Sequence, residues 1–184
     1  MKRKTILCLI VIAAVSASLL AGCGGGMTPA VVVATEYSII SREAPVETTA
    51  PKDWIFQGSN DNANWKTLDS RKGIKFAPIE KKTLAFSNTN PYRYYRLNVT
   101  SNGGNPNWLS ITELEIMGPG GKKLGPAMTS NDTPSPYVCS ASTEANADFA
   151  AWKAFDDFGG SAFASATGVT KGWLKFDFDK GSAK

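Results

Sequence analysis

The sequence predicts an all-β protein, an antiparallel sandwich or barrel built from many short strands. Apolar and polar residues alternate strictly along residues 173–178 and again along residues 95–99. This alternation is typical of a strand that is buried on one face. Only residues 147–155 are compatible with a helix, and then for one or two turns. Clusters of Gly, Asn, Ser and Pro, which favour turns, separate the strands at residues 58–62, 87–91 and 101–106.

The first element of the chain is a secretory signal, predicted at residues 1–22. A basic start precedes an apolar run from Ile6 to Leu20, and small residues follow, which is the order of a cleavable signal peptide. The run is too short for a durable transmembrane helix, so the alternative of an uncleaved membrane anchor is disfavoured. Leu20-Ala21-Gly22-Cys23 resembles a bacterial lipobox, which implies cleavage before Cys23 and a lipid on its thiol.

This resemblance implies a lipoprotein of the bacterial cell envelope, anchored to a membrane on its extracytoplasmic side through the Cys23 lipid. Gly24, rather than Asp, follows the lipidated residue, which favours export to an outer membrane where the source has one. Residues 23–30 are then a tether, and its three consecutive glycines make it flexible.

A single domain is predicted over residues 31–184. About 160 residues remain after the signal, which is enough for one hydrophobic core. Besides the two strictly alternating segments, further strands are expected at residues 31–40, 54–57, 66–68, 82–86 and 114–116.

Charge and reactive side chains argue against several functional classes. Three of the 20 Lys and Arg residues lie in the signal, which leaves 17 against 16 Asp and Glu residues, so no nucleic-acid surface is expected. The chain has no His, which removes the commonest general base and all imidazole metal sites. Cys139 has no partner once Cys8 is cleaved off and Cys23 is lipidated. We therefore expect no disulfide, a buried Cys139 and no enzymatic activity.

Several segments resemble one family. Residues 50–61 contain Pro51-Lys52-Asp53-Trp54, and residues 152–157 read Trp-Lys-Ala-Phe-Asp-Asp. With residues 64–69, 92–97, 111–118 and 172–178, they are similar to the discoidin domain, also called the coagulation factor V/VIII type C domain. That family includes the family 32 carbohydrate-binding modules. The resemblance covers almost the whole predicted domain and implies an antiparallel jelly-roll sandwich.

The order of these segments differs from that of the family. The closing half of the domain occupies residues 31–118, a linker occupies residues 119–126, and the opening half occupies residues 127–184. Two arrangements account for this order: a circular permutation, or a tandem array cut partway through its second repeat. Neither half has enough strands to cover its own apolar face, and the first and last strands of such sandwiches commonly lie side by side. Permutation is therefore favoured, and it predicts that residues 173–178 share one core with residues 92–99.

The resemblance further implies a structural calcium, held by carboxylate and carbonyl oxygens of a tight loop. Relatives usually have Asp-Gly-Asn/Asp followed by Thr, whereas this chain has Asp-Asp-Phe-Gly-Gly-Ser at residues 156–161. The alternative is a metal-free turn closed by hydrogen bonds to Asp156. The implied ligands are the carbonyls of Lys153, Phe158 and Thr112, with the side chains of Asp156, Ser161 and Glu113.

Relatives of the family 32 type bind terminal sugars on loops at one end of the sandwich. Trp108 follows a polar, Gly-rich stretch and suits a stacking platform for the apolar face of a sugar. The polar candidates beside it are Arg42, Asn105, Glu144 and Asn146, whose side chains can direct hydrogen bonds to hydroxyls. The other Trp residues, at positions 54, 65, 152 and 173, are expected to pack in or against the core.

Non-catalytic binding of a glycan or polysaccharide by a monomer is thus the predicted function. One alternative is an adhesion module that binds protein or phospholipid, as discoidin domains elsewhere do. A glycosidase is the weaker alternative: Glu113 and Glu115 are spaced to share a strand face and paired carboxylates can hydrolyse glycosides, but a solvated strand face is the simpler interpretation.

Overall fold

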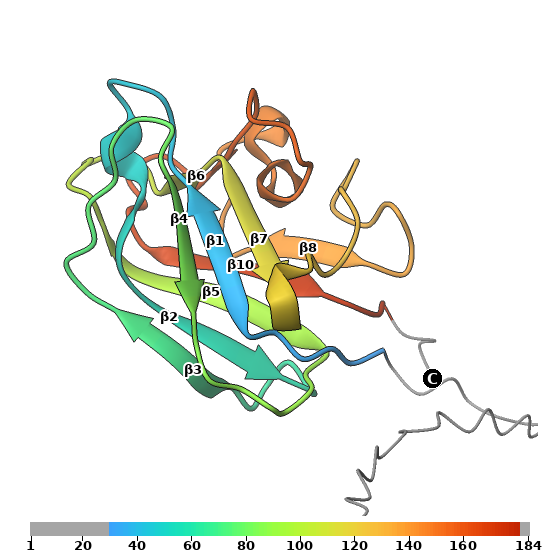
Figure 1. Ribbon diagram of the computed structural model, residues 1–184. Helices are drawn as coiled ribbons and strands as arrows, with labels where there is room; N and C mark the ends of the chain where they lie inside the picture. The colour runs from blue at the N-terminus through green and yellow to red at the C-terminus, as the bar shows by residue number, and fades with distance from the viewer. Residues whose placement is uncertain (1–29, 181–184) are drawn as a thin grey trace, which may run out of the picture.

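A five-stranded antiparallel sheet and a three-stranded antiparallel sheet form the two layers of the protein (Figure 1). The computed structural model describes residues 30–180. The larger sheet has the order β3-β2-β5-β10-β8, the smaller one β4-β1-β7, and β6 pairs with β9 in a short ribbon. The strands are β1 (Glu36–Ile40), β2 (Pro51–Ser59), β3 (Lys66–Arg71), β4 (Lys81–Ala85), β5 (Tyr94–Asn102), β6 (Ser110–Ile111), β7 (Glu113–Met117), β8 (Val138–Ala141), β9 (Phe163–Ala164) and β10 (Gly172–Asp177).

The core lies between the two sheets because each sheet turns its apolar positions inward. On β10, Leu174 and Phe176 are buried, whereas Lys175 between them is partly exposed on the outer side. Phe56 of β2 stacks on Tyr37 of β1 with ring centroids 4.3 Å apart, which joins the two layers. Burial of these apolar faces is the main stabilising contribution to such a fold. The prediction of an all-β, antiparallel protein is confirmed, and the two-layer arrangement agrees with a sandwich.

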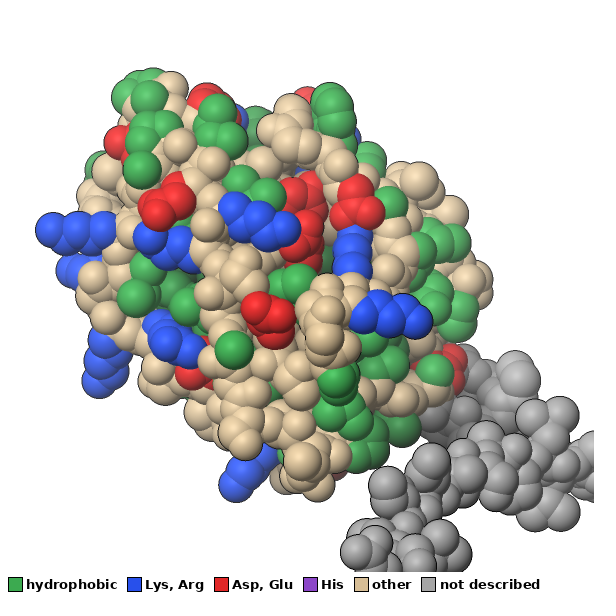
Figure 2. Space-filling model, viewed as in Figure 1, with side chains coloured by type: hydrophobic (Ala, Val, Ile, Leu, Met, Phe, Trp, Pro, Cys, Tyr) green, Lys and Arg blue, Asp and Glu red, His purple; other side chains and the backbone are tan. Residues whose placement is uncertain are grey.

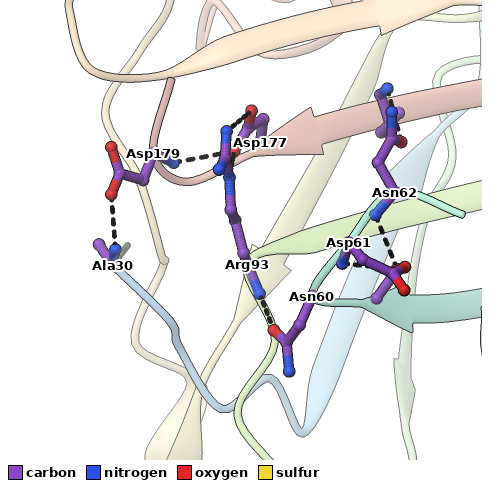
Figure 3. A network of polar contacts seen from close by, with 9 residues as sticks. Ala30, Asn60, Asp61, Asn62, Arg93, Asp177 and Asp179 are labelled. Carbon is purple, nitrogen blue, oxygen red and sulfur yellow. Dashed lines mark hydrogen bonds and ion pairs between the residues drawn. The ribbon is translucent and has the colours of Figure 1, made fainter. Parts of the chain in front are cut away.

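Strands from both ends of the sequence meet in the five-stranded sheet. β10 pairs with β5 in an antiparallel register that places Leu174 opposite Leu97, and it pairs with β8 on its other side. Beyond the C-terminal end of β10, the Ala30 amide donates to Asp179 Oδ2 at 2.8 Å, so the two ends of the described chain lie side by side (Figure 3). The expectation that residues 173–178 share a core with residues 92–99 is confirmed.

The predicted linker, residues 119–126, turns the chain back along β7 before it crosses to the other sheet. It begins with the 3₁₀ turn η2 (Pro119–Gly121), and the Leu124 amide then donates to the Ile116 carbonyl at 2.8 Å. Gly125 has a positive φ of 81°, and a β-carbon there would lie 3.1 Å from the Phe176 ring. Glycine therefore permits both the turn and the close approach to the core.

The sequence predicts most strands with small errors at their ends. The expected strand at residues 31–40 is shorter than predicted, because Val32 makes only an isolated bridge with Tyr92 and β1 begins at Glu36. The short strands β6, β8 and β9 are not predicted, since two to four residues carry too little alternation. The expected helix at residues 147–155 is a pair of 3₁₀ turns, η3 (Ala147–Phe149) and η4 (Ala151–Ala154), and a further unpredicted turn is η1 (Glu47–Thr49).

The predicted signal peptide at residues 1–22 and the lipidated Cys23 lie outside the described residues, as does nearly all of the tether. Between residues 30 and 180 no helix has the length and apolar character needed to cross a membrane.

Candidate functional site

A pocket of about 240 Å³ opens at the loop end of the sandwich. Three residues that the sequence nominates for ligand binding line it together: Arg42 from the loop after β1, Trp108 from the loop before β6, and Asn146 from the entry to η3. Phe149 and Thr167 also line the pocket. Three segments far apart in the sequence thus build one concave surface with an aromatic ring and polar groups, as small-molecule sites require.

Two asparagines hold the loop that presents Trp108. The Asn102 amide donates to the carbonyls of Asn105 and Trp108, both at 2.7 Å. Asn105 Oδ1 accepts from the backbone amides of Asn107 at 2.9 Å and Trp108 at 3.1 Å. The half-buried indole is therefore fixed by its own loop, and its Nε1 lies 3.4 Å from Thr167 Oγ1. Asn105, nominated as a ligand contact, instead bonds the backbone that positions Trp108.

Arg42 brings an unsatisfied donor to the pocket. One terminal nitrogen pairs with Glu43 Oε1 at 2.7 Å, and the guanidinium carbon lies 5.6 Å from the centre of the Phe149 ring. Its Nε atom is buried and has no hydrogen-bond partner within residues 30–180. Burying a donor without a partner costs free energy.

Asn146 and Glu144 have different positions. Asn146 Oδ1 accepts from the Asp148 amide at 2.9 Å and caps η3, while the residue lines the pocket. Glu144 Oε1 accepts from the Ala151 amide at 2.9 Å and from Asn131 Nδ2 at 3.2 Å. Glu144 is not among the residues that line the pocket. Its carboxylate orients the start of η4.

The pocket residues that the sequence does not nominate are mostly apolar or small. Phe149 lies beneath the Arg42 guanidinium, and its only sequence signal is its place in the short helix expected at residues 147–155. Thr49, Ser110, Ala164 and Thr167 carry no signal, because such residues are common in loops and strand ends.

The residues implied as calcium ligands also come together. Ser161 Oγ lies 2.6 Å from Asp156 Oδ2, 3.2 Å from the Phe158 carbonyl and 3.4 Å from the Lys153 carbonyl. Glu113 joins them from β7, because its Oε1 accepts from the Phe158 amide at 3.0 Å. Oxygen donors from both halves of the chain thus surround one loop, which is the chemistry that Ca²⁺ prefers.

Glu113 shows that this cluster is electrostatically incomplete. The residue is 3% exposed, and its Oε2 is buried without a hydrogen-bond partner in the described chain. Burial, together with the hydrogen-bonded Asp156 carboxyl, raises the pKa of Glu113 to about 8. A bare oxygen beside a second carboxylate fits a hard cation. Thr112, the remaining implied ligand, is fixed by its hydroxyl, which donates to the Ser41 carbonyl at 3.0 Å.

No three side chains of His, Cys, Asp or Glu form a metal-binding group within the part of the chain that the structure describes. The implied calcium ligands include only two carboxylates, and the others are backbone carbonyls and a hydroxyl. Such a set does not contain three acidic, His or Cys side chains. Asp157, in the same loop, has a φ of 59°. Asp is among the few residues that tolerate this left-handed region, and its carboxylate pairs with Lys123.

Other reactive groups are engaged or buried. Cys139 is 1% exposed, and burial raises the pKa of its thiol to about 12, which confirms the expectation of a buried residue. Of the Glu113–Glu115 pair, Glu115 accepts from the Ser38 hydroxyl at 2.6 Å and pairs with Lys81. Trp54 lies in the core and Trp152 packs against it, as expected, whereas Trp65 and Trp173 are half-buried and are not among the residues packed against the core, so the expectation is wrong for these two.

A comparison with models of known protein families finds no match to this sequence, and a comparison with curated proteins finds none either.

Proposed function

We propose that this chain is a lipid-anchored protein of the bacterial cell envelope that binds carbohydrate without catalysis. Its sandwich is a circularly permuted discoidin-like jelly roll, and its sugar site is the pocket of Arg42, Trp108 and Asn146. In support of the permutation, residues 31–118 and residues 127–180 contribute strands to one sheet. The lipid anchor rests on the lipobox-like sequence that ends at Cys23.

One observation carries the proposed site. Three of the five residues nominated from the sequence, on three separate loops, line the same pocket. A sugar ring stacked on the Trp108 indole would place hydroxyls within reach of the Arg42 guanidinium and the Asn146 amide. An aromatic face and a few directional donors are the usual means of sugar recognition without chemistry.

Calcium is proposed as a structural cofactor of the neighbouring loop. Asp156, Glu113 and Ser161, with the carbonyls of Lys153, Phe158 and Thr112, would hold it. When bound, the ion supplies positive charge to two adjacent carboxylates and fixes the loop. This loop bears on the sugar pocket, because a second hollow of about 430 Å³ is lined by Lys153, Phe158 and Ser161 and shares Arg42 and Phe149 with the pocket.

A glycan array with protein lacking residues 1–22 tests the sugar site. Trp108→Ala should abolish binding to the preferred neutral glycan and leave the melting temperature nearly unchanged, because a half-buried platform contributes to the complex rather than to the core. Phe76→Ala is the control, since Phe76 is also half-buried but lies in the loop between β3 and β4, outside both proposed sites. The proposed site is wrong if Trp108→Ala unfolds the protein while residual sugar affinity persists, or if both variants weaken binding equally.

Chelation tests the calcium loop independently of any sugar. A ligand that binds only the folded state stabilises it by about 3 kcal/mol at a hundredfold excess over its Kd, so a chelator should lower the melting temperature. Glu113→Gln and Asp156→Ala should each remove this sensitivity, whereas Asp132→Ala, a change of charge at an exposed pair, should retain it. A wild-type protein that melts identically with calcium and with chelator would refute a calcium site.

One observation favours adhesion to a lipid surface as a second candidate function. Ile79 is 67% exposed and Phe158 is 63% exposed. Both lie near Arg42: the Ile79 amide donates to the Arg42 carbonyl at 3.0 Å, and Phe158 shares the second hollow with Arg42. Sedimentation with phospholipid vesicles should be lost in Ile79→Ser/Phe158→Ser if this function is correct. Equal sedimentation of the variant and the wild type would exclude it.

A further inference from the structure

A row of aromatic rings and cations lies on the outer face of the five-stranded sheet. The Arg96 guanidinium carbon is 4.0 Å from the centre of the Trp65 ring. The Lys175 ammonium is 5.2 Å from the Trp173 ring and 5.7 Å from the Tyr94 ring. All five side chains are half-buried, and alternate residues of the same strands face the core. We call these five residues, Trp65, Tyr94, Arg96, Trp173 and Lys175, the outer-face row.

Two like charges oppose one another in this row. Arg96 on β5 is the direct cross-strand partner of Lys175 on β10. Like charges at such positions destabilise a sheet, and neither cation forms an ion pair within residues 30–180. Asp177 is the sole carboxylate on β5 and β10, both fully described, and Arg93 already binds both of its oxygens at 2.7 and 2.8 Å. The row therefore has two positive charges that no carboxylate of residues 30–180 pairs with.

Neighbouring groups hold both cations in place. Arg96 Nε donates to Gln57 Oε1 at 2.8 Å, and Lys175 Nζ donates to Asn62 Oδ1 at 2.9 Å. Asn62 belongs to a turn organised by Asp61, whose Oδ1 accepts from the Ala63 and Asn64 amides at 2.9 and 2.7 Å. Figure 3 shows Asp61 and Asn62 of this turn beside the Arg93–Asp177 pair. Cations fixed before binding lose little conformational entropy when an anion arrives.

The geometry points to a linear anionic polysaccharide as the ligand of this face. We propose that the outer-face row is a second binding surface, where Arg96 and Lys175 pair with carboxylates on a chain lying across β5 and β10 and the three rings contact its sugars. A flat sheet face with charges on adjacent strands suits an extended chain. A bilayer is less suited, since the row's rings are half-buried and the most exposed large apolar side chains are Ile79, Phe158 and Val31. This surface is distinct from the loop-end pocket and does not depend on it.

The test uses full-length protein in non-ionic detergent, passed over immobilised polygalacturonate, with immobilised neutral dextran as the reference. The wild type should bind polygalacturonate but not dextran, and rising salt should weaken binding. Lys175→Gln and Arg96→Gln should each weaken binding about tenfold, the scale of one charge-assisted hydrogen bond. Lys180→Gln is the matched control, because it removes one charge from an exposed residue whose pair is Asp132, and it should bind as the wild type does.

Three results would overturn the proposal. The first is equal weakening by Lys180→Gln and Lys175→Gln, which would show that only net charge matters. The second is equal or stronger binding to phosphatidylglycerol vesicles or single-stranded DNA through the same two cations. The third is unchanged binding in Lys175→Gln. Trp108→Ala separates the two sites, since it should leave polygalacturonate binding intact even where it abolishes binding of neutral glycan.

Discussion

The two outer faces of the sandwich differ in how their charged side chains are paired. On the three-stranded sheet, Lys81 pairs with Glu115, and Glu115 also accepts from the Ser38 hydroxyl. Figure 2 shows this face, on which acidic and basic side chains are interspersed. On the five-stranded sheet, Arg96 and Lys175 lie against aromatic rings and have no carboxylate partner within the described chain. Both faces follow the same strand alternation, yet opposite charges meet at Lys81 and Glu115 on the first, whereas like charges meet at Arg96 and Lys175 on the second.

The Arg93–Asp177 pair is the exception on the five-stranded face, and breaking it should have the largest effect. Both side chains are largely buried, at 16% and 10% exposure. Asp177→Ala leaves the guanidinium without its partner, which should lower the free energy of unfolding by about 3 kcal/mol. Urea denaturation measures this loss. Asp132→Ala removes an exposed pair with Lys180, at 56% and 55% exposure, and should lower the free energy of unfolding far less. Equal losses in the two variants would mean that burial of the Arg93–Asp177 pair adds nothing to its contribution to stability.

The second effect concerns the Lys81–Glu115 pair on the three-stranded sheet. Glu115→Ala leaves the hydroxyl of Ser38, a residue with 0% exposure, without its acceptor, and should cost about 1–3 kcal/mol. Although burial acts in the opposite direction, the hydrogen bonds from Lys81 and Ser38 lower the pKa of Glu115 below its ordinary value. A lowered pKa stabilises the fold above the ordinary carboxyl pKa, and that stability is lost as the pH falls through the native value. Urea titrations on the acid side should therefore show a smaller loss in Glu115→Gln than in the wild type.

The smallest effect has the opposite sign. Lys175→Gln removes one of the two cations that lie opposite each other on the five-stranded sheet. The change should raise the free energy of unfolding by up to about 1 kcal/mol. The Lys175 pKa is already lowered, chiefly by burial, which agrees with a charge that is unfavourable where it lies. A variant that is clearly less stable than the wild type would show that the ring contacts of the ammonium outweigh the repulsion, and the contrast between the faces would then fail.

Prediction from sequence succeeds where the signal is local. The alternation in residues 173–178 predicts β10 and its buried face, because a strand presents successive side chains to opposite sides. The same alternation assigns Asp177 to the outer, polar side, and the residue is nonetheless 7% exposed. Arg93, from another strand end, covers it. Burial of a polar residue by a distant partner leaves no local pattern.

The candidate site shows the same difference between what a local sequence pattern predicts and what distant contacts decide. Trp108 and Arg42 can be nominated from their chemistry and from a family resemblance, but their meeting in one pocket depends on how the loops after β1 and before β6 are placed. Asn105 and Glu144 are equally polar in sequence, yet their side chains bond backbone amides. Which polar group faces a ligand and which supports a loop is decided by distances that a linear pattern does not contain.

By itself, the sequence determined the all-β class, the approximate strands, the absence of His and the lipobox-like sequence at residues 20–23, because each depends on neighbouring residues or on composition alone. The tertiary structure alone decided that β10 lies between β5 and β8, that Glu113 reaches the 153–161 loop, and that Arg96 faces Lys175. These contacts join residues far apart in the chain. They follow from sheet order and register, which are set by the shared burial of many apolar side chains rather than by any one segment.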